Sequence, residues 1–131
     1  MSAKQILEMH ARELTTTTSL AIEVIQQGER LFVLIHDYQL PPAVSQVEKT
    51  DVLFITDSQY PFSAMDMFWV KIEVIRRGGS IFENSDSIED YIERKWRRFS
   101  YHRNNIWNPT GNALMDHFAF METRWTGKAV R

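Results

Sequence analysis

Hydrophobic positions near the N-terminus recur at helical spacing and predict a first helix. The side chains at this spacing are Ile6, Leu7, His10 and Leu14. Ser2 and Gln5 stand three residues apart ahead of them, as in a capping box. The threonine run at 15–18 should end the helix, because β-branched residues are poor helix formers. We therefore expect a short helix over residues 2–13.

Apolar residues then recur at every second position in several segments, which predicts strands. The expected strands cover residues 20–25, 30–35, 51–56 and 67–74. Gly28 stands between the first two and suits a tight hairpin turn. This order predicts a four-stranded antiparallel meander.

The chain after residue 74 shows less regular patterns. Gly78 and Gly79 should end the sheet, and a short helix is expected over residues 87–94. From residue 96 to 110 no period holds, so we expect an ordered irregular segment pinned by aromatic side chains. Asn112 should cap a last helix. The apolar stripe of that helix consists of Leu114, Phe118, Met121 and Trp125.

These elements predict an α+β fold in one domain, residues 1–131. We expect an N-terminal helix, the meander, and the C-terminal helix packed on the sheet. The chain shows no internal repeat, linker or low-complexity tract. Its 44% hydrophobic and 24% charged residues are typical of a globular protein.

Charge and composition narrow the function classes. A net charge of −2 argues against nucleic acid or an anionic membrane as the partner. The chain contains no cysteine, which excludes disulfides, thiolate metal sites and a cysteine nucleophile. No apolar run reaches the length of a membrane span, and charges interrupt the N-terminus where a signal peptide would be apolar. We expect a cytoplasmic protein.

Two aromatic motifs carry a resemblance to a known superfamily. Tyr60-Pro61-Phe62 precedes the fourth expected strand, and Trp107-Asn108-Pro109 precedes the last helix. Their order is similar to that in the ubiquitin-conjugating-enzyme (UBC) superfamily. The Tyr-Pro-Phe motif of those enzymes continues into a Pro-Pro pair, where this chain has Ser63-Ala64.

A bacterial branch, the prokaryotic ubiquitin-conjugating-enzyme-like family E, is a closer match. The segments that resemble it are Leu40-Pro41-Pro42, Met65-Asp66-Met67-Phe68-Trp69, Trp96-Arg97-Arg98-Phe99-Ser100-Tyr101-His102, Trp107-Asn108-Pro109 and Asp116-His117-Phe118. The resemblance implies a UBC-like fold. It also implies a role in a bacterial ubiquitin-like pathway, beside an activating enzyme, a deconjugase and ubiquitin-like proteins.

Conjugating enzymes carry their thioester on a cysteine that precedes the Trp of Trp-x-Pro by about seven or eight residues. Counting back from Trp107 reaches Phe99 or Ser100. Ser100 could carry an acyl group only as an oxyester, and His102 is the one base nearby in sequence. The alternative, which we favour, is that Ser100 is a turn residue and His102 a loop hydrogen-bonding residue, since no third group completes a constellation.

The other histidines give no clear site. His117 on the last helix could meet His102, or with Asp116 suggest a metal, but no ligand spacing supports a metal site. We therefore expect an ordinary helix histidine at 117, and no metal or cofactor.

Basic and aromatic residues are interleaved between residues 94 and 103. We expect a partner-binding surface there, formed by Arg94, Trp96, Arg97, Arg98, Tyr101 and Arg103. Such interleaving also occurs where bases are stacked, but the net charge disfavours that reading. Tyr60, Pro61, Phe62, Trp107 and Pro109 are read as structural motif residues.

Three hypotheses follow. The first is a noncatalytic UBC-like adaptor that binds a ubiquitin-like protein or its activating enzyme. The second is a transferase or ester-forming enzyme that uses Ser100 with His102. The third is an interaction module of the RWD type. The missing cysteine favours the first and third, and we adopt the first. The sequence leaves open whether the chain forms a homodimer.

Overall fold

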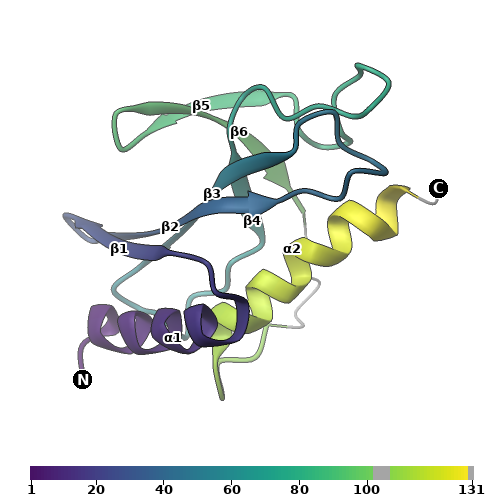
Figure 1. The fold of residues 1–131 in the computed structure, drawn as a ribbon. Coiled ribbons are helices and arrows are strands. Elements are labelled where there is room, and N and C mark those ends of the chain that lie inside the picture. The colour runs from purple at the N-terminus through teal and green to yellow at the C-terminus, as the bar shows by residue number, and fades with distance from the viewer. Residues whose placement is uncertain (102–106, 130–131) are drawn as a thin grey trace.

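A computed structural model describes residues 1–101 and 107–129, with side chains up to Trp125 (Figure 1). One six-stranded antiparallel sheet, ordered β1-β2-β3-β4-β6-β5, carries two helices on one of its faces. The elements are α1 (Ala3–Thr18), β1 (Ile22–Gln27), β2 (Arg30–Gln39), β3 (Lys49–Asp57), β4 (Met67–Val70), β5 (Ser87–Tyr91), β6 (Arg94–Ser100) and α2 (Ala113–Ala129).

The predicted meander is present as β1 to β4, and the hairpin turn at Gly28 has the expected positive φ of 61°. The prediction of only four strands was wrong. Residues 87–91 form a strand rather than a helix. Residues 94–100 form its partner β6, although the chain was expected to be irregular from residue 96. β6 also pairs with β4, which ends at Val70 rather than at residue 74.

The turn between β5 and β6 explains why sequence patterns missed this hairpin. Ile92 and Glu93 both have positive φ, 45° and 63°. Such turns normally carry Asn or Gly at these positions. With neither residue present, the segment lacked the sequence signal of a two-residue hairpin.

The first helix is longer than predicted because the threonine run does not end it. α1 continues through Thr18, and Ser19 ends it in the left-handed conformation. The hydroxyls of Thr16, Thr17 and Thr18 each donate to the carbonyl oxygen four residues earlier. Threonine can be accommodated in this way inside a helix. The predicted capping box of Ser2 and Gln5 is present.

The last helix follows its prediction closely. The Asn112 side-chain oxygen accepts a hydrogen bond from the Met115 amide, which is the capping interaction expected of it. All four residues of the predicted stripe are buried: Leu114, Phe118, Met121 and Trp125. They join α1 and one face of the sheet in a single cluster, which we call the helix-side core.

A second apolar cluster lies on the opposite face of the sheet, which neither α1 nor α2 covers. This outer-face cluster consists of Phe32, Leu34, Leu53, Trp69 and Trp96. The Tyr91 ring lies 6.0 Å from that of Phe32, although three strands separate β5 from β2 in the sheet. The sheet therefore curls strongly enough to bring the β5–β6 hairpin over the outer face of β2.

Candidate partner-binding site

The Tyr60-Pro61-Phe62 turn joins three distant parts of the chain. Tyr60 is buried, and its hydroxyl lies 2.6 Å from His10 Nδ1 on α1. The Trp107 indole donates to the Pro61 carbonyl over 2.8 Å. The two motifs that carried the family resemblance are therefore bonded to each other, and both are anchored close to α1.

This anchored turn presents one aromatic ring to solvent. Phe62 is 76% exposed, whereas Tyr60 is 2% exposed. In the part of the chain that the structure describes, every other Phe, Tyr and Trp side chain is buried or half-buried. Phe62 was interpreted from the sequence only as a structural motif residue. Phe62 is an exposed ring next to two residues that are bonded to other parts of the chain.

The residues after Trp107 are ordered by a side-chain turn. The Asn108 carboxamide oxygen accepts from both the amide and the hydroxyl of Thr110, over 3.0 Å and 2.7 Å. This local arrangement brackets Pro109, which is half-buried. These hydrogen bonds order the backbone between Trp107 and the start of α2.

The bond between His10 and Tyr60 is a structural contact between neutral groups. Burial lowers the pKa of His10, against a smaller opposing effect of Glu13, and burial raises the pKa of Tyr60. The His10 carbonyl also accepts from the Asn112 side chain, which caps α2. His10 thus connects α1, the Tyr-Pro-Phe turn and the start of α2.

Ser100 lies at the end of β6, opposite Met67 of β4. Directly opposed residues of antiparallel strands share a face, and Met67 packs against the outer-face cluster. The preceding residue, Phe99, belongs to the helix-side core, as strand alternation requires. The Ser100 side chain therefore points to the outer face, away from both helices.

His117 lies on the other side of the sheet from Ser100. It is fully buried, with Nε2 2.9 Å from the Met67 carbonyl oxygen and its ring edge-on to Phe54 at 4.6 Å. The buried His117 ring is therefore hydrogen-bonded within the protein. Ser100 and His117 do not converge, because the sheet separates them. His102 lies outside the described residues.

Two arginines of the predicted partner surface hold the β5–β6 hairpin to its surroundings. Arg97 donates to the carbonyls of Ile72 and Ser85 over 3.1 Å and 2.7 Å. Arg98 forms an ion pair of 2.7 Å with Glu89 on β5. Their charged groups are therefore already engaged within the protein.

Arg94 is engaged in the same way. Its guanidinium pairs with Asp51 at 3.1 Å and lies 4.3 Å from the Trp96 ring. Trp96 and Tyr101 are buried, which leaves little of either ring for a partner. Arg103, the last residue of the predicted surface, lies outside the described residues.

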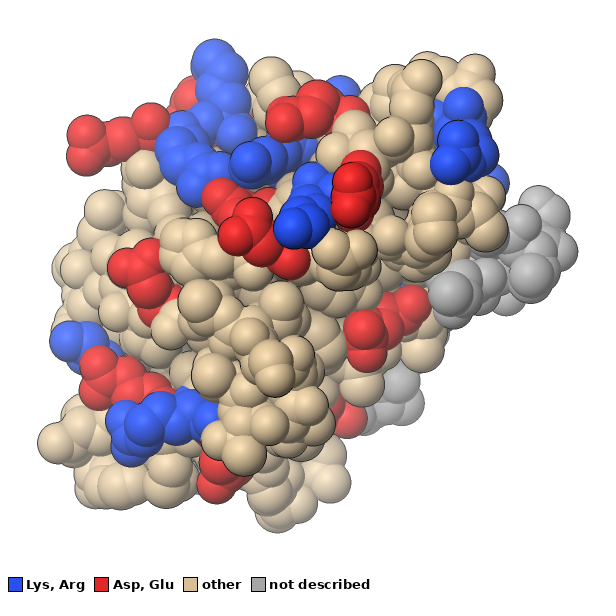
Figure 2. Space-filling model, viewed as in Figure 1, with Lys and Arg blue, Asp and Glu red and all other residues tan. Residues whose placement is uncertain are grey.

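The surface over this hairpin is of mixed charge. Figure 2 shows Lys and Arg interleaved with Asp and Glu over the upper part of the molecule, where β5 and β6 lie. The acidic partners Asp51 and Glu89 were missed in the sequence, because strand pairing between distant segments brings them to the arginines. Lys95, paired with Asp90 in an exposed contact, is the most accessible cation of β6.

Two further observations concern metal ions and membranes. Among the described residues, no group of three or more His, Asp or Glu side chains is placed to hold a metal ion. No helix in the same part of the chain is both long enough and apolar enough to cross a membrane.

Comparison with known proteins identifies the family. The profile of prokaryotic E2 family E matches residues 7–126. Neither the curated proteins nor the solved structures give a significant match. The matched segment includes the Tyr-Pro-Phe and Trp-x-Pro motifs and nearly all of the fold described above. The chain therefore belongs to prokaryotic E2 family E, a family of UBC-like proteins.

Proposed function

We propose that this protein is a noncatalytic UBC-fold adaptor of a bacterial ubiquitin-like conjugation pathway. It binds a ubiquitin-like protein or its activating enzyme in the cytoplasm. The observation that carries the proposal is the absence of cysteine from all 131 residues. A thioester cannot form without a thiol, so the chemistry typical of E2 enzymes has no nucleophile here.

The position of Ser100 supports the same proposal. Its side chain lies on the outer face of the sheet, and the buried His117 lies on the helix side. Within the described residues, no hydrogen bond connects the Ser100 hydroxyl to a base. A serine without an oriented base is a poor nucleophile at neutral pH.

Phe62 supports a docking role for the Tyr-Pro-Phe turn. An exposed aromatic ring on a support fixed by Tyr60 and Trp107 loses little conformational freedom on binding. Aromatic residues of this kind commonly dominate binding energy at interfaces. We propose Phe62 as the apolar anchor of the partner interface.

In the proposal, the segment from Arg94 to Arg103 supplies a second, charged part of the partner surface on the β5–β6 hairpin. Arg94, Arg97 and Arg98 keep their internal partners, so they would act through the field of the mixed surface rather than as free hydrogen-bond donors. Such peripheral charges affect association rate and specificity more than affinity.

Titration calorimetry with a ubiquitin-like protein and with its activating enzyme tests the proposal. Phe62→Ala should weaken binding about tenfold or more while leaving the melting temperature unchanged. Ile81→Ala, which truncates another exposed apolar side chain, is the matched control and should bind as the parent does. Equal affinity of the two variants would remove Phe62 from the interface. Failure of the parent to bind either protein would contradict the adaptor role.

A further inference from the structure

β1 forms one edge of the sheet, and its outer side pairs with no other strand that the structure describes. Gln27 pairs with Arg30 across the two-residue turn, and the His36 amide donates to the Ala21 carbonyl over 2.9 Å. Hydrogen-bonded and non-hydrogen-bonded pairs alternate along an antiparallel ladder. The peptide groups that point away from β2 are therefore those of Ile22, Val24 and Gln26.

This edge lacks the features that usually prevent strand addition. It contains no proline, lysine or bulge, and its one charged side chain, Glu23, is bonded to His36 at 2.6 Å. The opposite edge, β5, differs because Glu89 and Asp90 place two adjacent carboxylates on it. An edge without such protection can accept another strand.

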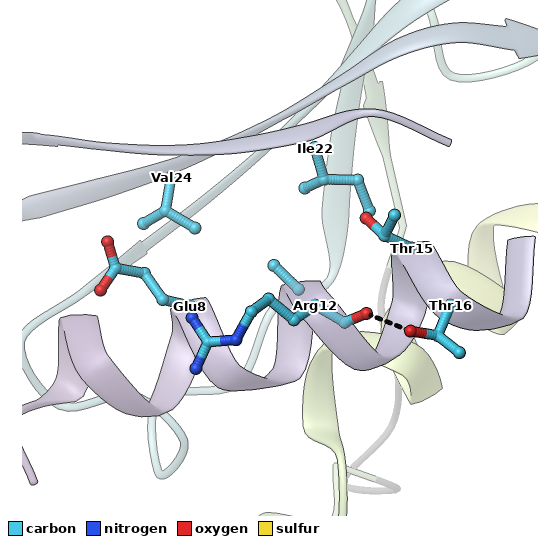
Figure 3. Close-up of a pocket in the computed structure, with 7 residues that line it drawn as sticks. Glu8, Arg12, Thr15, Thr16, Ile22 and Val24 are labelled. Carbon is cyan, nitrogen blue, oxygen red and sulfur yellow. Dashed lines mark hydrogen bonds between the residues drawn. The ribbon is translucent and has the colours of Figure 1, made fainter. Parts of the chain in front are cut away.

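A groove runs beneath the β1 edge, between this strand and α1 (Figure 3). The side chains of Ile22 and Val24 point from β1 toward the helix. A strand added to β1 would direct every second side chain toward this groove. Its volume is about 460 Å³, and it is lined by Glu8, Ala11, Arg12, Thr15, Thr16, Ile22 and Val24.

The charges of the groove indicate what the added strand should carry. Glu8 is paired with Lys4 at 3.9 Å. Arg12 is exposed and forms no ion pair with any other residue that the structure describes. A carboxylate that approaches Arg12 would gain an ion pair without breaking one. The rest of the lining is apolar or threonine and suits β-branched side chains.

We infer that the β1 edge binds an extended segment of a partner protein by antiparallel strand addition. The segment carries apolar, β-branched residues at alternate positions and one carboxylate that faces Arg12. Main-chain hydrogen bonds to Ile22, Val24 and Gln26 supply affinity, and the groove supplies specificity. The inference does not depend on the adaptor role, because it requires neither a ubiquitin-like protein nor Phe62.

The test titrates the isotope-labelled full chain with two capped heptapeptides and follows backbone amides by NMR. Both peptides alternate Val and Thr, so that four valines face the groove. In one peptide Glu replaces the second of these valines, and in the other it replaces the third. Binding should shift the amides of Ile22, Val24 and Gln26 and slow their hydrogen exchange. Methylating the amide nitrogens of the groove-facing residues should abolish binding, because these donors point to β1. Methylating the intervening nitrogens should not.

Protein variants provide the matched controls. Val24→Pro removes an outward donor without removing a bond to β2, and should abolish binding. Ile88→Pro makes the same change on the other edge, where Ile88 also lies at an outward position, and should bind as the parent does. Arg12→Glu should weaken binding of both peptides at least tenfold.

Three results would overturn the inference. The first is absence of binding by both peptides up to about 1 mM. The second is binding that persists when the groove-facing nitrogens are methylated. The third is concentration-dependent dimerisation of the chain that Val24→Pro abolishes, which would make a second copy the occupant of the edge.

Discussion

His10 Nδ1 and the Tyr60 hydroxyl oxygen lie 2.6 Å apart in the interior, and their bond connects α1 to the turn before β4. Neither residue stood out in the sequence as a partner of the other, because 50 residues separate them. The contact fixes the turn that presents Phe62. The support of the proposed interface thus depends on a buried pair of titratable groups.

The pair makes stability depend on pH. Burial lowers the pKa of His10 in the folded protein, so the unfolded chain binds a proton more readily than the folded one. Stability should therefore fall as pH drops below the unfolded pKa of about 6.5. His10→Gln should show a weaker decline than the parent when urea unfolding is compared at about pH 8 and pH 5.5. An identical pH dependence in both proteins would show that His10 does not carry the effect.

The packing of α2 can be tested at Phe118. Its ring is buried and lies edge-on to Tyr38 at 5.7 Å. Phe118→Ala should lower the free energy of unfolding by about 3–5 kcal/mol, because it leaves a cavity between helix and sheet. Ala119→Ser, at the exposed neighbouring position, should change it little. A thermal melt unaffected by Phe118→Ala would contradict the packing of this helix.

The β5–β6 turn offers a stabilising change. Glu93 is exposed and has a φ of 63°, a conformation that glycine adopts without steric cost. Glu93→Gly should raise the free energy of unfolding by about 0.5–1 kcal/mol, measured by chemical denaturation. Asp90→Gly, in the adjacent strand without positive φ, should lower it by a similar amount. Destabilisation by both substitutions would argue against the left-handed turn.

Substituting an arginine of the hairpin should lower the stability of the protein, because these arginines are bonded within it. Arg98→Gln breaks the partly buried ion pair with Glu89, and we expect a loss of about 1–3 kcal/mol. Lys95→Gln breaks an exposed pair with Asp90 and should cost less than about 0.5 kcal/mol. Equal losses in denaturant melts would mean that Arg98 is not structurally engaged. Lys95 is therefore the better position for testing the charge of this surface in binding experiments.

The parts predicted correctly from sequence are those specified by local patterns. The capping residues Ser2 and Asn112 and the apolar stripe through Phe118 and Trp125 act through neighbours three or four positions away. The meander was likewise read from alternation along each strand. In both cases the residues that make the contacts follow a regular spacing, which can be recognised in the sequence.

The parts that failed depend on distant residues. β6 carries Arg97 and Arg98 in a strand that lacks a clear apolar period, and they are accommodated because Ser85 and Glu89 supply partners. α1 passes the threonine run because the hydroxyls bond back to the helix and Leu14 is buried against the core. The exposure of Phe62 could not be read from the motif either, because two aromatic residues of the same Tyr-Pro-Phe turn have opposite environments: Tyr60 is buried and Phe62 is exposed.

A search for a covalent adduct tests the noncatalytic role of the protein most directly. The protein is mixed with its activating enzyme, a ubiquitin-like protein and ATP, and the intact mass is measured. We predict no covalent adduct while binding is retained, because the chain has no cysteine and Ser100 lies across the sheet from His117. A hydroxide-labile adduct that disappears in Ser100→Ala would contradict the adaptor role and show that the protein is an ester-forming transferase.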